Sequence, residues 1–306
     1  MERITTLMTS QATVYDLGQA LDRLNTTQAQ LSSGKRITQP SDDPYGTMLA
    51  MQLNGQLSSL TSYNSNVNDG TAFTQATDSS LMDMNNVVQR VRELVVQAAN
   101  GTNNQSNLDA DAQEVDQLTE AIKQSANATY DGQYIFSGTA NVMPYQSATG
   151  DVYQGNSGAG AAITRQIGPG ATNSVQINTD ISQLLGSGQT SPGVGDGKLL
   201  DVLRQVSADM TSGNSNALGT DLNNLDSNIS VLQGLQSTVG ATEDRLQLAS
   251  SRIQDLQLST TQNLSNDQDV DMGQAAINFS TEEAAYTAAL QASAKIVQSS
   301  LLNFLQ

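Results

Sequence analysis

The chain has 306 residues, a net charge of −17, and neither cysteine nor histidine. The charge argues against nucleic acid and anionic membrane surfaces as partners, because both are bound through basic side chains. The missing cysteine and histidine exclude disulfides, Ser-His-Asp and Cys-His catalysis and nearly all zinc, copper and haem sites, so we expect no cofactor and no metal.

No apolar run approaches the length of a membrane span, and the first residues lack the continuous apolar core of a secretory signal. We therefore expect no membrane insertion. The chain is expected to be cytosolic, or exported by a route that reads no cleavable signal.

Residues 5 to 31 carry a heptad pattern that predicts a helix with a coiled-coil-like seam. Its positions alternate in steps of three and four: Leu7, Ser10, Val14, Leu17, Leu21, Leu24, Gln28 and Leu31. The pattern leaves open whether the seam packs within its own domain or against another molecule.

The stretch that follows predicts a helix stop, a turn and a new helix start. Gly34 stands where a C-cap belongs, with Lys35 and Arg36 beside the carbonyl end of the helix. Asp42 and Asp43 lie between two prolines. We interpret them as turn and cap residues, and not as a metal or acid–base pair, because no histidine or further carboxylate clusters with them.

Apolar stripes predict helices over about 45–68, 78–100 and 107–128, with a break at Asn68-Asp69-Gly70. From Tyr130 the character changes. Asp131-Gly132 predicts a tight turn, and short β-like runs follow at Ala162–Ile167 and Ser174–Ile177. Helical patterns resume over about 198–211 and 215–264.

The end of the chain predicts one more amphipathic helix, from about Ser280 to Gln306, with Ser280 and Thr281 as possible caps. The alternating Asp267, Asp269 and Asp271 fail the spacing of a calcium loop and predict an acidic entry to this helix. The apolar stripe consists of Tyr286, Leu290, Ala294, Val297, Leu301 and Phe304.

Together these patterns predict a mainly α fold of long antiparallel helices, in which the two chain ends form a coiled-coil bundle and a small β-rich domain is inserted. We expect three parts. Residues 1–44 with 268–306 form a terminal helical assembly domain, 45–133 with 198–267 form a helical bundle body, and 134–197 form the inserted glycine-rich domain.

Several motifs resemble a known family. LSSGKRITQPSDDP (31–44), RVRELVVQAANGTNNQ (90–105) and YDGQYIFSGT (130–139) are similar to flagellin-type axial proteins of the bacterial flagellum. The start MERITT, the Pro-Ser-Asp-Asp-Pro form and the last 38 residues resemble the hook-associated protein 3 branch, which forms the hook–filament junction, more than flagellin itself. The likeness covers both flanks of the chain, and the glycine-rich middle contributes little.

The resemblance implies a flagellin-like fold and a structural protein that is not an enzyme. Such a protein passes through the flagellar type III export channel, is secreted, and polymerises into a tube beside an adjacent hook-associated protein and flagellin subunits. The resemblance also implies a flagellar export chaperone that binds the C-terminal helix before secretion.

A lone helix cannot bury its own apolar stripe, so we expect neighbouring subunits to bury the stripes of the two chain ends. On this reasoning the N-terminal assembly interface consists of Leu7, Val14, Leu17, Leu21, Leu24 and Leu31. The C-terminal interface for assembly and for the chaperone consists of Tyr286, Leu290, Ile296, Val297, Leu301, Leu302, Phe304 and Leu305.

Three alternatives stay open. A short flagellin would form the bulk filament and not the junction. A polysaccharide-acting or peptide-cleaving enzyme would need convergent carboxylates in the middle domain, where only Asp151, Asp180 and Asp196 occur, widely spaced. A cytosolic coiled-coil adaptor would remain inside the cell.

Overall fold

The fold comes from a computed structural model that describes residues 6–100, 104–146, 152–170, 172–186 and 195–304. The chain divides into two compact units. We call residues 1–59 with 256–306 the terminal unit, and residues 60–255 the body unit. The predicted three-part division of the chain stays a prediction.

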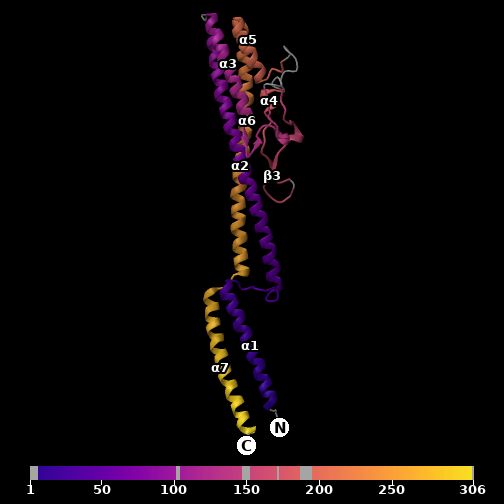
Figure 1. Cartoon of the computed structure of the whole chain (residues 1–306), viewed down its shortest axis with the longest axis vertical. Coiled ribbons are helices and arrows are strands. Elements are labelled where there is room, and N and C mark those ends of the chain that lie inside the picture. Colours follow the sequence, from indigo (N-terminus) through magenta and orange to yellow (C-terminus); the bar gives the residue numbers. More distant parts are fainter. Residues whose placement is uncertain (1–5, 101–103, 147–151, 171, 187–194, 305–306) are drawn as a thin grey trace. The chain divides into compact units, whose positions relative to one another are not determined.

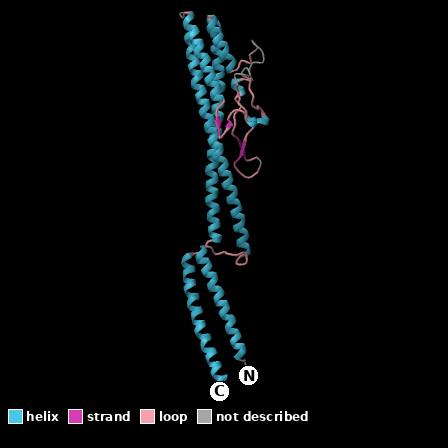
Figure 2. Ribbon diagram, in the orientation of Figure 1, coloured by secondary structure: helices cyan, strands magenta, loops and turns pink. Residues whose placement is uncertain are grey.

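The described residues are mainly helical (Figure 2). The helices are α1 (Thr6–Ser33), α2 (Pro44–Ala99), α3 (Gln105–Ala126), α4 (Ser182–Leu185), α5 (Leu199–Ser212), α6 (Ser215–Gln268) and α7 (Met272–Phe304). The strands are β1 (Thr129–Tyr130), β2 (Gln133–Tyr134), β3 (Thr164–Gln166) and β4 (Ser174–Gln176). This confirms the predicted fold class.

The body unit holds one continuous apolar core, whose members all lie between Leu60 and Ile253. The predicted stripe of α2 supplies its centre: Leu81, Met84, Val88, Val91 and Val95 are all fully buried. Stripes of α3, α5 and α6 face this row with Val115, Ile122, Leu203, Leu225 and Leu232. Long helices with one apolar face each bury those faces against one another, so the body unit has its own hydrophobic core.

Helix ends in the body unit are closed by local side chains and by glycine. Asn104 caps α3 by accepting a hydrogen bond from the Ser106 N–H at 2.6 Å. Gly213 ends α5 in the left-handed conformation at φ 67°, where its N–H donates to the last carbonyls of the helix. Both ends follow the usual pairing of Asn or Ser at N-caps with Gly after the last turn.

The inserted segment forms two small antiparallel ribbons, β1–β2 and β3–β4. The predicted turn at Asp131-Gly132 is present, with φ angles of 49° and 74°, as a two-residue hairpin requires. The segment is fastened to the helices of the body unit. Ile177 packs into the apolar core, and the Asn66 side chain donates to the Gln166 carbonyl at 2.9 Å.

Two predicted boundaries are wrong. The break expected at Asn68-Asp69-Gly70 is absent, because α2 continues through it. Gly70 is buried, and a Cβ there would lie 3.3 Å from Ile177 Cγ2 and 3.4 Å from a Leu246 methyl. This glycine therefore permits close packing and does not mark a turn.

The last helix starts eight residues earlier than predicted. Asp271 precedes α7, and its Oδ1 accepts the N–H groups of Gly273 at 2.9 Å and Gln274 at 3.1 Å. The expected caps Ser280 and Thr281 lie inside the helix and donate to carbonyls four residues back. Asp271 ends the acidic run, so the predicted acidic entry to this helix is confirmed.

Candidate functional site

The terminal unit contains an antiparallel helix pair, α1 with α7, whose free ends lie together (Figure 1). The positions of α1 that turn away from solvent step by four and three: Thr13, Leu17, Ala20, Leu24, Thr27 and Leu31. Those of α7 step in the same way: Ala275, Phe279, Glu282, Tyr286, Ala289 and Ser293. We call these two rows the seam. Of its twelve members, Ala20, Thr27 and Ala275 are buried and the other nine are half-buried.

The seam includes a polar bond at its middle. The Thr27 hydroxyl donates to Glu282 Oε2 at 2.5 Å across the two helices. Small side chains on both rows, such as Ala20 and Ala289, allow the helices to lie close but bury little apolar area. The described part of the seam therefore contributes little hydrophobic stabilisation.

The predicted N-terminal interface is divided between two sides of α1. Leu17, Leu24 and Leu31 are half-buried in the seam. Val14 and Leu21 point outward, 68% and 40% exposed. The seam uses Ala20 and Thr27 where the heptad pattern placed Leu21 and Gln28. The side chain of Leu7 lies outside the described residues.

The predicted C-terminal interface is described only in part. Tyr286 is half-buried on the seam, and Leu290 is 40% exposed beside it. The remaining predicted side chains lie outside the described residues: Ile296, Val297, Leu301, Leu302, Phe304 and Leu305. The assembly role of both sets stays a prediction.

The loop after α1 is tied to the junction between α6 and α7. The Arg36 N–H donates to the Gln268 carbonyl at 2.7 Å, and the Val270 N–H donates to the Gly34 carbonyl at 3.0 Å. Gly34 ends α1 at φ 71°, as predicted for a C-cap. These backbone bonds hold the root of the α1–α7 pair.

Arg36 occupies the centre of this root. Its Nη2 donates to the Asp267 carbonyl at 2.8 Å and to Asp43 Oδ2 at 3.2 Å. The sequence predicted that Arg36 lies at the carbonyl end of α1, but its guanidinium donates a hydrogen bond to a carbonyl at the end of α6. A cation at a helix C-terminus satisfies carbonyls that lack intrahelical partners.

Asp42 and Asp43 act as the predicted turn and cap residues. Asp42 Oδ2 accepts the N–H groups of Thr38 at 3.0 Å and Gln39 at 2.8 Å. Hydrogen bonds from the Gln39 N–H, the Thr38 hydroxyl and the Thr38 N–H lower the pKa of Asp42. Asp43 Oδ1 accepts the Gly46 N–H at 2.9 Å, and this bond lowers the pKa of Asp43.

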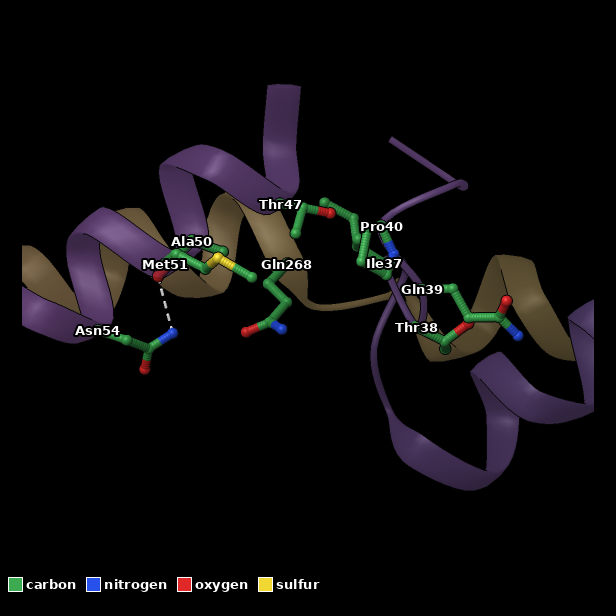
Figure 3. Close-up of a pocket in the computed structure, with 9 residues that line it drawn as sticks. All are labelled: Ile37, Thr38, Gln39, Pro40, Thr47, Ala50, Met51, Asn54 and Gln268. Carbon is green, nitrogen blue, oxygen red and sulfur yellow. Dashed lines mark hydrogen bonds between the residues drawn. The ribbon is translucent and has the colours of Figure 1, made fainter. Parts of the chain in front are cut away.

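A shallow groove of about 220 Å³ opens beside the root (Figure 3). Its walls come from the loop after α1, the first turns of α2 and the end of α6. The lining mixes apolar and amide side chains: Ile37, Thr38, Gln39, Pro40, Thr47, Ala50, Met51, Asn54 and Gln268. None of these side chains titrates near neutral pH, so the groove suits contact with another surface better than acid–base chemistry.

Apolar side chains are distributed very unevenly between the two units. Of the 18 large hydrophobic side chains that are exposed among the described residues, 12 belong to the terminal unit. Of the 42 hydrophobic residues that are buried where the structure describes burial, five belong to it, and three of those five are alanines. The described part of the terminal unit therefore exposes many apolar side chains and buries few of them.

Sequence reasoning missed part of this surface. Tyr45, Met48 and Met51, on the first turns of α2, are 59–71% exposed. Leu256 and Leu258 are exposed near the end of α6. The only sequence signal was apolar residues that fall beside the α2 and α6 stripes, such as Met48 next to Leu49.

Neither a cluster of metal-ligating side chains nor a membrane-spanning helix occurs in the part of the chain that the structure describes. There, no three acidic side chains come together as a cation site would require. The described helices also include none with both the length and the apolar character needed to cross a bilayer.

Two family models match this chain. The bacterial flagellin N-terminal helical region matches residues 4–141, and the bacterial flagellin C-terminal helical region matches residues 222–305. A flagellin of Salmonella muenchen is 39% identical over 42% of this chain and 26% of its own length. Flagellin 1 of Proteus mirabilis is 34% identical over 48% of this chain and 41% of its own.

Solved structures share the fold. A protein of Vibrio parahaemolyticus described as a flagellar hook-associated protein has a TM-score of 0.64 at 22% identity, over 74% of this chain and all of its own. Flagellar hook-associated protein 3 of Legionella pneumophila has a TM-score of 0.61 at 13% identity, over 71% and 98%. The two family models together span more than two thirds of the chain, at both of its ends, and the chain belongs to the flagellin-like family of bacterial flagellar proteins.

Proposed function

We propose that this protein is a structural subunit of the bacterial flagellum that forms the hook–filament junction by polymerising through its terminal unit. One observation carries the proposal: among the described residues, the terminal unit holds five of the 42 buried hydrophobic residues but two thirds of the exposed large hydrophobic side chains. Exposed apolar surface on this scale is typical of an interface that another molecule covers.

The physical driving force is the burial that neighbouring subunits supply. Apolar area removed from water stabilises by about 25 cal/mol per Å² before the entropy of ordering is subtracted. The α1–α7 pair exposes Met8, Val14 and Leu21 on one helix and Ile277 and Leu290 on the other. Repeated head-to-tail contacts between such surfaces build rings or helical tubes, according to their rotation.

The two units have separate roles in this proposal. The terminal unit forms the inner tube, which the sequence-based domain division assigned to residues 1–44 and 268–306. The body unit, which has its own hydrophobic core, sets the spacing of subunits. A scaffold with these roles is not an enzyme.

We further propose the partners and place that the family likeness implies. Within the flagellum the subunit contacts copies of itself, an adjacent hook-associated protein and flagellin. It acts outside the cell after type III export, and an export chaperone covers the C-terminal helix beforehand. Two large apolar side chains of α7, Ile277 and Leu290, are exposed, and this supports the proposal that a chaperone covers the helix.

The second candidate is a short flagellin of the bulk filament, because the sequence relatives carry that name. The likeness of the fold to solved hook-associated proteins supports the junction over the bulk filament. Immunogold labelling of intact flagella distinguishes the two. We expect a few copies at the hook tip, whereas label along the whole filament would establish the flagellin alternative.

A truncation tests the assembly mechanism. Deleting residues 298–306 shortens α7 but leaves every residue of the body unit in place. We expect a folded, soluble protein that no longer joins hook to filament. A stable filament grown on this variant would contradict assembly through the terminal helices.

A further inference from the structure

The body unit has two acidic side chains at core positions of adjacent helices. Asp209 of α5 continues the buried stripe of Val202 and Val206, and it is 8% exposed. Asp221 of α6 lies between the fully buried Leu218 and Leu225, and it is 4% exposed. Carboxylates are rarely buried this deeply without a compensating partner.

No basic side chain is bonded to either carboxyl group among the described residues. Asp209 Oδ2 accepts a hydrogen bond from the Gln205 side chain at 2.8 Å, whereas Asp221 Oδ2 has no hydrogen-bond partner. Besides burial, Asp221 is affected by Asp209, through a side-chain hydrogen bond and through its charge.

Among the described residues, Arg92, Arg204 and Lys123 of the neighbouring helices bond to groups other than this pair. Arg92 of α2 bonds Asp226, five residues further along α6, with its Nε 2.7 Å from Oδ1. Arg204 of α5 donates to a carbonyl of its own helix. α3 carries five acids, and its one base, Lys123, bonds Glu120 with its Nζ 2.7 Å from Oε1, and α4 carries no charged residue.

We propose that Asp209 and Asp221 form a proton-binding site, in which one proton taken from mildly acidic solution is shared between the two carboxyl groups and holds α5 against α6. The proton binds one carboxyl, and its O–H donates to the other carboxylate, so two negative charges become one. The body unit is consequently more stable in mild acid than at neutral pH. This inference does not rest on the proposed function.

The pair is more stable with one proton bound than with both carboxyl groups charged. Burial, the hydrogen bond to Asp209 and the charge of Asp209 raise the pKa of Asp221 to about 6. A carboxyl whose pKa is raised on folding binds its proton more tightly in the folded chain. The stabilisation therefore appears as the pH falls through about 6 and is lost as the pH rises through it.

Two measurements on the full-length chain test the site. Side-chain carboxyl NMR of the unmodified protein should show one carboxyl of the pair titrating near pH 6. Thermal unfolding between pH 7.5 and 4.5 should show a higher Tm in mild acid. Asp221→Asn should raise Tm at pH 7.5 by roughly 5 °C and flatten this dependence, because the amide replaces the charge.

Asp226→Asn is the matched control on the same helix. It removes the exposed bond to Arg92, so it should leave the pH dependence unchanged and should not raise Tm. Titration of both carboxyls of the pair below pH 4.5 would overturn the proposal, and so would a lower Tm for Asp221→Asn at pH 7.5. If that variant does not fold, the NMR titration of the unmodified protein and the Tm of Asp209→Asn decide.

Discussion

Replacing Val14 and Leu21 together by serine should weaken assembly and leave the free subunit folded. Both side chains lie on the outward side of α1, 68% and 40% exposed, so they contribute little to the monomer. Fully burying a Val or Leu side chain contributes about 1.5–3 kcal/mol. Scaled by the exposed fractions, the two lose about 2 kcal/mol of association free energy per subunit. That loss corresponds to about a 30-fold rise in the protein concentration needed to polymerise.

Sedimentation at a series of concentrations measures this threshold, and circular dichroism melts check the monomer. Met82→Ser with Val96→Ser is the matched control, because these side chains are 48% and 40% exposed on α2 in the body unit. We expect the control to polymerise like the unmodified protein. An unchanged threshold for the α1 variant, or an equal rise in the control, would refute assembly through this face.

Three further predictions concern the root of the helix pair. Gly46→Ala should lower stability by about 1–3 kcal/mol in circular dichroism melts, because its Cβ would lie 2.5 Å from Ile37 Cδ1; an unchanged melt would contradict this packing. Arg36→Ala should speed proteolysis of the loop after α1, because the bond to the Asp267 carbonyl is lost, and equal cleavage rates would count against its role. The Gly46 N–H lowers the pKa of Asp43, so this cap stabilises above the carboxyl's ordinary pKa. The stabilisation should be lost as the pH falls through the lowered value, and loop proteolysis that stays constant from pH 5 to 2.5 would oppose it.

The sequence predicted the helices of the body unit well, because their apolar stripes are long and nearly all leucine, valine or methionine. The row from Leu81 to Val95 is buried throughout, as its spacing required. The hairpin at Asp131-Gly132 was equally predictable, because an Asp-Gly pair readily adopts the two positive φ angles that a two-residue turn requires.

The sequence could not predict which side of α1 pairs with α7. Its leucines fall on two adjacent stripes, and hydrophobicity alone favours the row with Val14 and Leu21. The structure instead pairs small residues such as Ala20, whose size permits close approach, and it adds the bond between Thr27 and Glu282. Such a choice depends on the shape of the partner helix, which a pattern within one segment does not contain.

Local signals also misled where tertiary contacts decided. The sequence predicted a turn at Gly70, but Ile177 and Leu246 pack against its backbone and leave little room for a Cβ. The burial of Asp209 and Asp221 could not be predicted from the sequence, because acidic side chains usually face solvent. Their burial follows from the way α5 and α6 meet, and this requires the fold.

Hydrogen exchange of the backbone amides of α1 in the free and the assembled protein tests the central claim most directly. The account predicts fast exchange of Thr6–Ser33 in dilute monomer, because the seam buries little, and strong protection after polymerisation. Amides of α2 between Leu81 and Val95 should be protected in both states. Equal protection of α1 in the monomer and the polymer would contradict a terminal unit that neighbouring subunits complete.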